Sequence, residues 1–429
     1  MKLPAHGSSL DDVMARLRSL QVNDGDYHNA RTWGLIYNAG PDVDEVLQAA
    51  AGHVLLENAL NPFVFPSLKE MQRDIVEMVT GLLHGGDEIG GTMTSGGTES
   101  IFMAVKTARD RMRAERGIEK GRLIIPRTAH PAFVKAAHLL DLELAYMPLD
   151  DDLRTRAEDL TGIITPDTVL AVGSAPAYPH GMIDPIPEMA KIASDAGVPF
   201  HVDACLGGLM LPFLERLGHD IPPWDFRVPG VSSISADLHK YGYAIKGASV
   251  ILHRPKANLR HQIFMYNDWP GGIYGTLAFL GTKPAAPIGA CWAVLQYLGE
   301  EGYLRLARET MDTTQRLIAG VKALDGVHVW GEPDMTVVAL GSHTHDILAV
   351  GDVLNTRGWH FDRQEGPAAL HLMTSPRHSL VVDEFLDDLR VALQDHAAAS
   401  TKAATYGDDV SAEAAATFGA PPSSDPKSR

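Results

Sequence analysis

The chain has few cysteines and no long hydrophobic segment. Only Cys205 and Cys291 occur among its 429 residues, which is too few for a disulfide framework and is typical of a reducing compartment. No apolar run reaches the roughly 18 residues that a membrane-spanning helix needs, and the N-terminus lacks the basic-then-apolar pattern of a signal peptide. We therefore predict a cytoplasmic protein without a transmembrane segment.

Basic residues are also in the minority. Lys and Arg number 37 against 54 Asp and Glu, so the formal net charge is −17. Such a chain does not hold nucleic acid or an anionic membrane by general electrostatics, although one local basic pocket for a phosphate is compatible with it. We expect no nucleic acid partner. The length suits two domains with large cores rather than one.

One lysine is a candidate for a reactive group. The stretch from Ser233 to Tyr243 is a run of small, β-compatible residues that ends in His239-Lys240 and an aromatic turn. Apolar neighbours desolvate an amine, which lowers its pKa and leaves more of the free amine that condenses with an aldehyde. We therefore predict that Lys240 is the Schiff-base partner of pyridoxal phosphate. The alternative is a solvated surface charge, the usual environment of lysine.

An acid upstream supports the same cofactor. The apolar run that begins at Val198 stops at Asp203, which predicts a buried parallel strand with the acid at its carboxyl end. Ligands of open α/β sheets bind at such ends. A carboxylate there can pair with the protonated pyridine nitrogen of the cofactor. The interval to Lys240 leaves room for a crossover and one more strand, so the two side chains can meet across one pocket.

Small residues predict a phosphate site nearby. Ser95-Gly96-Gly97-Thr98 follows a short strand and precedes a helix that we expect from Ile101. Free backbone N–H groups at the positive end of a helix bind phosphate. The loop is not a Walker motif, because no Gly-Lys-Ser/Thr follows. An ordinary helix cap, with glycine for close packing, is the alternative.

Three further positions have two interpretations each, and one histidine pair is considered as a metal site. His130, at a strand-to-helix turn, is either a stacking partner of the cofactor ring or a structural histidine. Tyr37 is either a phenol in the pocket or a packed aromatic. Lys246 is either a second pocket amine or a solvated turn charge. The histidines between Gly341 and Asp346 have no further ligands in a recognisable spacing, so we predict no metal site.

Strands and helices alternate from about residue 89 to about residue 251, which predicts an α/β protein with a mainly parallel, wound sheet. A long helix then leads into a smaller α+β unit. Ser67 is expected to cap a helix that reaches about Leu83, with Glu70 completing a capping box. The predicted parts are an N-terminal segment (1–58), a large cofactor-binding domain (59–297), a small C-terminal domain (298–396) and a disordered tail (397–429).

Several motifs together resemble one enzyme family, the sphingosine-1-phosphate lyases. These belong to the group II pyridoxal-phosphate decarboxylases, which have the aspartate-aminotransferase type of fold (fold type I). The resemblance covers about residues 34 to 396. It is carried by Thr94–Ser100, Pro179–Pro185, His201–Gly208, Asp225–Val231, Ser233–Gly247 and Trp269–Tyr274.

The resemblance implies a cofactor, pyridoxal phosphate, and a set of roles. It implies that Lys240 is the Schiff-base lysine, Asp203 the partner of the pyridine nitrogen and His130 the stacking histidine. The implied ligands of the cofactor phosphate are Gly97, Thr98 and His239. The implied groups on the substrate side, with catalytic roles for the first three, are Tyr37, Tyr178, Lys246 and Asn58.

The resemblance also implies an assembly. Family members are homodimers with shared active sites, and the Gly271-Gly272 loop reaches the site of the neighbouring subunit, which makes Gly272 a cofactor contact there. Eukaryotic members carry a membrane anchor that this chain lacks, so it resembles the soluble bacterial form.

The chain departs from the family pattern at Asn61 and Phe63, and again at Gly275-Thr276 and Thr282-Lys283, where the family has Ser-Pro and Ser-Arg. Asn61 stands where the family has a histidine that helps to hold the substrate phosphate, and Phe63 stands where it has an acid. Asparagine still hydrogen-bonds a phosphate but carries no charge. We predict a carbon–carbon lyase that cleaves a phosphorylated amino alcohol to an aldehyde and phosphoethanolamine. The alternative is an amino-acid decarboxylase of the same superfamily, which would need a clamp for the substrate carboxylate.

Overall fold

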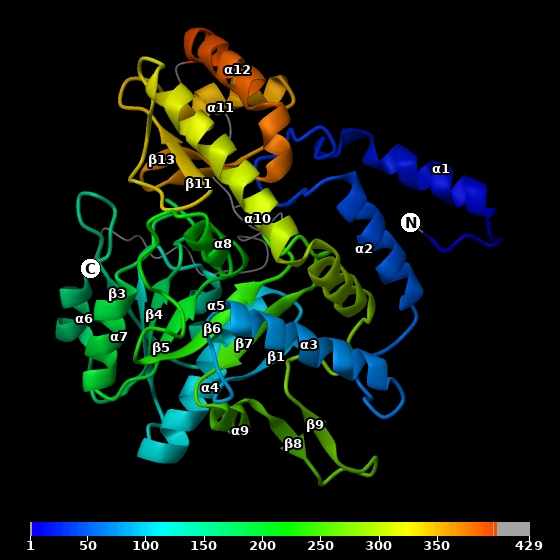
Figure 1. The fold of residues 1–429 in the computed structure, drawn as a ribbon, viewed down its shortest axis with the longest axis vertical. Coiled ribbons are helices and arrows are strands. Elements are labelled where there is room, and N and C mark those ends of the chain that lie inside the picture. Colours follow the sequence, from blue (N-terminus) through cyan, green and yellow to red (C-terminus); the bar gives the residue numbers. More distant parts are fainter. Residues whose placement is uncertain (1, 398, 401–429) are drawn as a thin grey trace.

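The computed structural model describes residues 2–397 and 399–400. A large α/β part surrounds a seven-stranded sheet, and a smaller part with its own four-stranded sheet lies above it in Figure 1. Most of the predicted tail, residues 398 and 401–429, lies outside the described residues. The boundaries that we predict between the domains stay a prediction.

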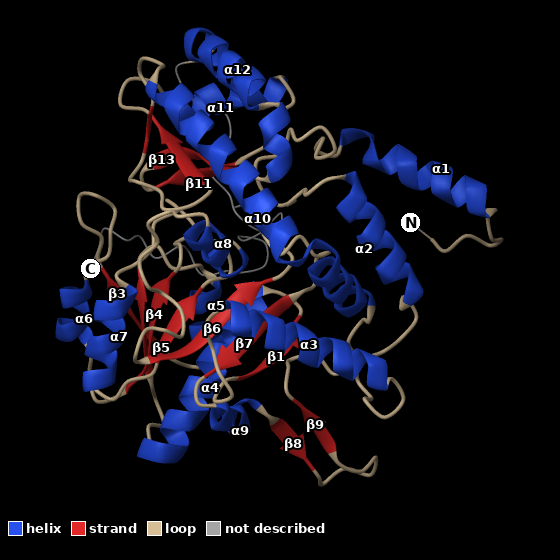
Figure 2. Cartoon of the chain, viewed as in Figure 1, coloured by secondary structure: helices blue, strands red, loops and turns tan. Residues whose placement is uncertain are grey.

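The large sheet is mainly parallel, as predicted. Strands β6, β5, β4, β2 and β3 pair in parallel, whereas β7 pairs antiparallel with both β1 and β6. Figure 2 shows these strands in red at the centre of the large part. In sheet order they are β1 (Gly90–Thr94), β7 (Ser249–His253), β6 (Val231–Asp237), β5 (Phe200–Asp203), β4 (Thr168–Ser174), β2 (Arg122–Pro126) and β3 (Glu143–Met147).

Helices cover both faces of this sheet. Successive side chains of a strand point to opposite faces, and Ile124 of β2 packs in one apolar cluster while Leu123 and Ile125 pack in another. All seven residues of β4 are buried, as expected for a strand covered on both sides. The surrounding helices are α3 (Pro66–Leu82), α4 (Gly97–Arg116), α5 (Ala132–Leu139), α6 (Ala157–Ile163), α7 (Ile186–Asp195), α8 (Leu211–Arg216) and α9 (Leu259–Gln262).

The smaller part is an antiparallel sheet with helices. A long helix, α10, leads into it and is interrupted at Gly299, whose φ of 53° is non-helical. Trp33 of the N-terminal segment is buried in the apolar cluster of this part and donates its backbone N–H to the carbonyl of His360. Its elements are α10 (Ala286–Lys322), β10 (His328–Val329), β11 (Val337–Gly341), α11 (Ile347–Thr356), β12 (Asp362–Glu365), β13 (Ala368–Met373) and α12 (Val382–Asp395).

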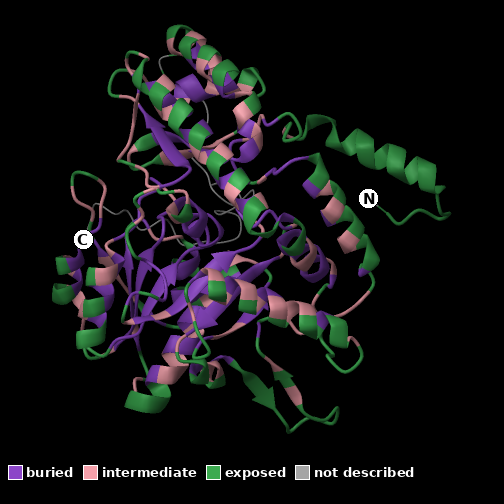
Figure 3. Cartoon of the chain, viewed as in Figure 1, coloured by how far each residue is buried: buried purple, intermediate pink, exposed green. Residues whose placement is uncertain are grey.

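Three segments lie at the periphery. Helix α1 (Leu10–Leu20) has no buried residue and is exposed along its length in Figure 3, α2 (Pro41–His53) packs on α10, and the hairpin of β8 (Phe264–Tyr266) and β9 (Tyr274–Thr276) projects from the large part (Figure 1). No helix in the described part of the chain is long and apolar enough to cross a membrane.

The predicted start of α3 is wrong. The helix begins at Pro66, Phe65 is the residue that precedes it, and no side chain caps it. Proline suits the first helical position, because its missing N–H would have no helical partner there. Ser67 therefore lies inside the first turn, and no capping box with Glu70 forms.

Candidate active site

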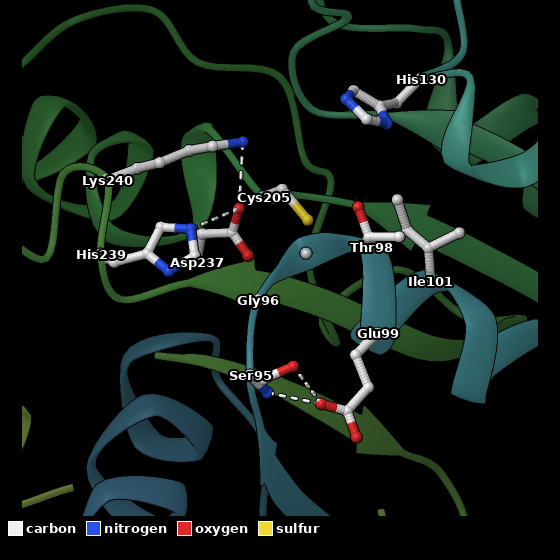
Figure 4. Close-up of a pocket in the computed structure, with 11 residues that line it drawn as sticks. Ser95, Gly96, Thr98, Glu99, Ile101, His130, Cys205, Asp237, His239 and Lys240 are labelled. Atoms are coloured by element: carbon white, nitrogen blue, oxygen red, sulfur yellow. Dashed lines mark hydrogen bonds and ion pairs between the residues drawn. The ribbon is translucent and has the colours of Figure 1, made fainter. Parts of the chain in front are cut away.

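A cavity of about 280 Å³ lies where β1 and β6 end and α4 begins. Ligand sites of α/β sheets are expected at such an edge. The cavity brings Lys240 together with the predicted phosphate loop and with His130 (Figure 4). Its lining residues are Ser95, Gly96, Gly97, Thr98, Glu99, Ile101, His130, Cys205, Asp237, His239 and Lys240.

Lys240 follows the end of β6 and forms an ion pair. Its Nζ lies 3.0 Å from Oδ2 of Asp237. Burial alone would lower the pKa of Lys240, but the charge of Asp237, with smaller contributions from Cys205, Tyr37 and Asp203, raises it well above its usual value. The predicted shift toward the free amine is therefore wrong for the protein without cofactor. Desolvation lowers the pKa as expected, but the negative charge of Asp237, for which no role was predicted, raises it by more.

Asp203 is the last residue of β5, as predicted, and is buried. Its Oδ1 accepts hydrogen bonds from the backbone N–H of Cys205 at 3.1 Å and from the hydroxyl of Ser235 at 3.3 Å. These bonds orient one carboxylate oxygen. Its charge acts on both His130 and Lys240, which places Asp203 beside the cavity. Its role toward a pyridine nitrogen stays a prediction.

The phosphate loop opens α4 directly. The helix begins at Gly97, four residues before the predicted start at Ile101. Its first backbone N–H groups, which have no partner within the helix, therefore belong to the loop itself. Glu99 accepts hydrogen bonds from both the backbone N–H and the hydroxyl of Ser95 at 2.6 Å. It also accepts one from the backbone N–H of Phe279 at 2.6 Å. The carboxylate thereby fixes the loop and ties it to the segment after β9.

His130 lies across the cavity from Lys240 in Figure 4. Its Nδ1 accepts the backbone N–H of Ala132 at 3.1 Å, so the ring is held by the start of α5. Burial lowers the pKa of His130, although Asp203 opposes the shift. The ring is therefore neutral at pH 7, which suits stacking on a flat, electron-poor ring.

Lys246 and Tyr37 lie beside the reactive lysine. Nζ of Lys246 donates to the carbonyl oxygen of His239 at 3.0 Å and lies 5.3 Å from the ring centre of Tyr37. Burial, and then the positive charge of Lys240, lower the pKa of Lys246 to about 8. The residue is exposed at the surface, but its lowered pKa lets this amine exchange a proton nearer to neutral pH than an ordinary lysine amine does.

Tyr178 joins the cavity region to the smaller part. Its hydroxyl donates to Oδ2 of Asp362 in β12 at 2.6 Å, and its ring stacks on His371 of β13 with centroids 4.2 Å apart. An edge contact, with centroids 6.3 Å apart, links the same ring to His130. Residues of the smaller sheet thus position a phenol close to the predicted stacking histidine.

Asp203, Tyr37, Tyr178 and Lys246 lie beside the cavity rather than in its lining, and three further predicted residues also do not line it. The Asn58 side chain accepts backbone N–H groups of Leu60 and Lys283, and that of Asn61 accepts those of Phe63 and Val64. Both amide oxygens therefore serve local turns. Gly272, with a φ of 96°, lies in the turn of the projecting hairpin. Roles for these three residues in a site stay predictions.

Four residues around the site were not predicted from the sequence. Asp237 and Cys205 stand inside motifs that carry the family resemblance, but nothing in the sequence pairs Asp237 with Lys240 or Cys205 with Ser235. Glu99 could have been suspected as a charge at the start of a helix. Asp362 is contributed by a distant strand, so no local signal points to it.

The chemistry of these groups fits pyridoxal phosphate. Helix N–H groups, Thr98 and His239 provide donors for a phosphate at one end, and Lys240 provides an amine for an aldehyde. At Gly97 an added Cβ would lie 2.8 Å from Oδ2 of Asp237 and 3.0 Å from Sγ of Cys205. Glycine is therefore required for this close approach.

Known proteins are similar to this chain over most of its length. Residues 42–341 match the family model of the pyridoxal-dependent decarboxylase conserved domain. The chain is 37% identical to sphingosine-1-phosphate lyase 1 of Mus musculus over 391 residues, which are 90% of this chain and 69% of the mouse protein. It is 39% identical to sphingosine-1-phosphate lyase of Arabidopsis thaliana over 400 residues, which are 91% of this chain and 73% of that protein.

Solved structures agree with these relatives. The sphingosine-1-phosphate lyase of Burkholderia pseudomallei matches with a TM-score of 0.89 at 39% identity, over 92% of both chains. Glutamate decarboxylase of Lactobacillus brevis matches with a TM-score of 0.81 at 20% identity, over 92% of this chain and 95% of that one. The second match shows the fold alone.

Proposed function

The chain belongs to the sphingosine-1-phosphate lyases of the pyridoxal-dependent decarboxylase family, and we propose that it cleaves a carbon–carbon bond in a phosphorylated amino alcohol. Membership makes it a lyase that uses pyridoxal phosphate. The proposed substrate is sphingosine-1-phosphate or a close analogue, and the products are an aldehyde and phosphoethanolamine. The observation that carries the proposal is Lys240 in a cavity bordered by the helix start of a phosphate loop.

The residues of the site have separate proposed roles toward the cofactor. When bound, the cofactor supplies an electron sink for the pair released by the broken bond. Lys240 would hold it, Gly97, Thr98 and His239 would bind its phosphate, Asp203 would accept a hydrogen bond from its protonated pyridine nitrogen, and His130 would pack on its ring.

Proton transfer is assigned to the second amine. Lys246, whose pKa is about 8, takes the proton of the substrate hydroxyl as the bond beside it breaks. Tyr178 and Tyr37 orient the substrate next to this amine. Asn58 and Asn61 donate hydrogen bonds to the substrate phosphate. Because both lie away from the cavity of their own chain, they donate to the substrate in the site of the neighbouring subunit.

Two copies of the chain are proposed to form this site together. Exposed apolar side chains gather on the projecting hairpin, where Ile273 is 74% exposed, and on the segment before α3, where Phe63 is 94% exposed. Isolated soluble chains rarely leave such groups uncovered. The hairpin turn, with Gly272, would then reach the cofactor of the partner. A cytoplasmic location is proposed because Cys205 and Cys291 are both free and buried.

A single-turnover experiment tests the reaction. Cofactor-loaded protein is mixed with sphingosine-1-phosphate, and any aldehyde is trapped and identified by mass. A long-chain aldehyde in an amount equal to the sites supports the proposal, and Lys240→Ala should abolish it. Release of carbon dioxide from amino acids, with no aldehyde from the phosphorylated amine, would instead establish a decarboxylase.

A further inference from the structure

A buried carboxylate beside Lys240 has no assigned role. Asp237 is the last residue of β6 and is 2% exposed. We propose that Asp237 is a positioning residue: it is the counter-ion that keeps the Lys240 nitrogen positively charged and directed into the cavity, before and after that nitrogen binds the cofactor. The proposal rests on the pyridoxal phosphate chemistry above but not on the identity of the substrate.

The two carboxylate oxygens of Asp237 have different surroundings. Oδ2 lies 3.0 Å from Nζ of Lys240, whereas the buried Oδ1 has no hydrogen-bond partner within the described residues. Removing a carboxylate from water costs several kcal/mol unless a cation or donors compensate. Lys240 is therefore the group that makes this buried charge tolerable, and Asp237 in turn fixes where Nζ points.

His239 cannot replace Lys240 as the cation. Its Nε2 is 3.6 Å from Oδ2 of Asp237, which is too long for a hydrogen bond. Its Nδ1 accepts the backbone N–H of Ala248 at 3.2 Å, so that nitrogen carries no proton and the ring is neutral. His239 is left to donate from Nε2, and the positive charge opposite Asp237 is that of Lys240.

Other charged or titratable groups also face Lys240. One carboxylate oxygen of Asp203 is engaged by Cys205 and Ser235, and Lys246 is a like charge. Within the part of the chain that the structure describes, Asp237 is the acid within ion-pair distance of Lys240. The groups that act on Lys240 or respond to it include Asp237, Cys205, Tyr37 and Asp203, with Lys246, His130 and Tyr241.

The geometry leaves the carboxylate little freedom. An added Cβ at Gly97 would lie 2.8 Å and 2.9 Å from its two oxygens, so the carboxylate packs against the first turn of α4. Condensation of an ammonium with an aldehyde gives a protonated imine and one water, with no net gain or loss of protons. The nitrogen carries one positive charge before and after the reaction, so the same counter-ion serves both states.

The test replaces only the charge. In the cofactor-loaded protein, the visible absorbance of the lysine-bound cofactor is titrated with pH for wild type and Asp237→Asn, which has nearly the same shape. Loss of a counter-ion at this distance should lower the pKa of the bound nitrogen by about one unit or more. The matched control is Asp195→Asn, which removes the same charge from an exposed pair with Lys191 and should leave the titration unchanged. An unchanged titration in Asp237→Asn would overturn the proposal.

A second measurement leaves Asp237 in place. Cofactor-free Lys246→Met protein, which lacks the neighbouring amine with a pKa of about 8, is mixed with pyridoxal, which carries the aldehyde but no phosphate, and the rate of imine formation is followed against pH. A charged Lys240 predicts a rate that still rises beyond about pH 10, the ordinary range of a lysine amine. A plateau already near pH 8 would contradict the counter-ion role. Failure to cleave sphingosine-1-phosphate would leave both readouts untouched, so the two proposals fail separately.

Discussion

Lys246 is the residue whose protonation should set the pH dependence of turnover. Burial and Lys240 lower its pKa to about 8, and a base must be neutral to accept a proton. Activity should therefore rise as pH increases through about 8 and level off above it. In Lys246→Met, kcat should fall by about 100-fold or more, and this rising limb should disappear from the pH profile.

The control for this prediction is Lys191→Met, which removes an exposed lysine whose only described ion-pair partner is the surface residue Asp195. Its profile should match that of wild type. A Lys246→Met protein that keeps the rise near pH 8 would assign the titration to another group.

For individual residues, the sequence predicted which side chains meet in the site better than it predicted their charge states. Lys240, His130 and the phosphate loop meet in one cavity, because strand ends and helix starts are signalled by local patterns. The pKa of Lys240 was predicted in the wrong direction, because Asp237 acts through a contact three residues away whose geometry depends on how the turn after β6 folds. Pair distances of this kind are absent from a linear pattern.

Among the elements, the loop between β1 and α4 should be the least tolerant of added volume. Gly97→Ala would put a methyl group within 2.8 Å of Asp237 and 3.0 Å of Cys205, so the loop or the β6 end must move. Affinity for pyridoxal phosphate, measured by equilibrium dialysis of the cofactor-free protein, should fall by at least about tenfold, which is roughly the loss of one good hydrogen bond to a charged group.

Gly162→Ala provides the matched control, because this glycine lies in α6 and an added Cβ there meets nothing within 4 Å. Its cofactor affinity should be that of wild type, and its stability should rise slightly, since alanine favours a helix. Equal affinities for the two alanine variants would show that the loop adapts.

The element boundaries show where local rules end. The end of β5 at Asp203 was predicted, because an apolar run that stops at an acid is a strong local signal. The start of α3 was not, because Pro66 begins the helix before the predicted cap at Ser67. The contact between Trp33 and the smaller sheet was also beyond prediction, since it joins segments that are far apart in sequence.

For the whole molecule, buried histidines predict acid sensitivity. Burial lowers the pKa of His180, His201, His253 and His378 to about 4 each. The unfolded chain binds these protons near pH 6.5, so the stability they confer is present above that pH and is lost as pH falls toward 4. Asp184 opposes the trend, because burial raises its pKa to about 7.

On acidification the four histidines lower the stability of the folded protein by more than Asp184 raises it. Together these five should change the free energy of unfolding by roughly 3 to 4 kcal/mol per pH unit near pH 5. Thermal unfolding of the cofactor-free protein at pH 7, 6, 5 and 4 should show a steep fall in Tm. A Tm that stays level over this range would mean that the histidines are already hydrated.

Assembly decides whether one chain holds a complete site. In one subunit, Gly272 lies on the projecting hairpin away from Lys240, and a positive φ of 96° makes a larger residue there costly. If the hairpin completes the site of the partner, Gly272→Val and Lys240→Ala should each be inactive alone. A mixed dimer would then contain one site with an intact lysine from one subunit and an intact hairpin from the other.

Mixing the two inactive proteins should therefore restore activity. Random exchange makes half of the dimers mixed, and each has one complete site, so the expected recovery is about a quarter of the wild-type value. Size-exclusion chromatography must show a dimer for each protein and for the mixture, because exchange requires that form. The matched control mixes Lys240→Ala with a Gly272→Val, Lys240→Ala double variant, which has no intact lysine in either subunit and should stay inactive. An inactive test mixture of exchanged dimers would mean that each subunit builds its site from its own residues.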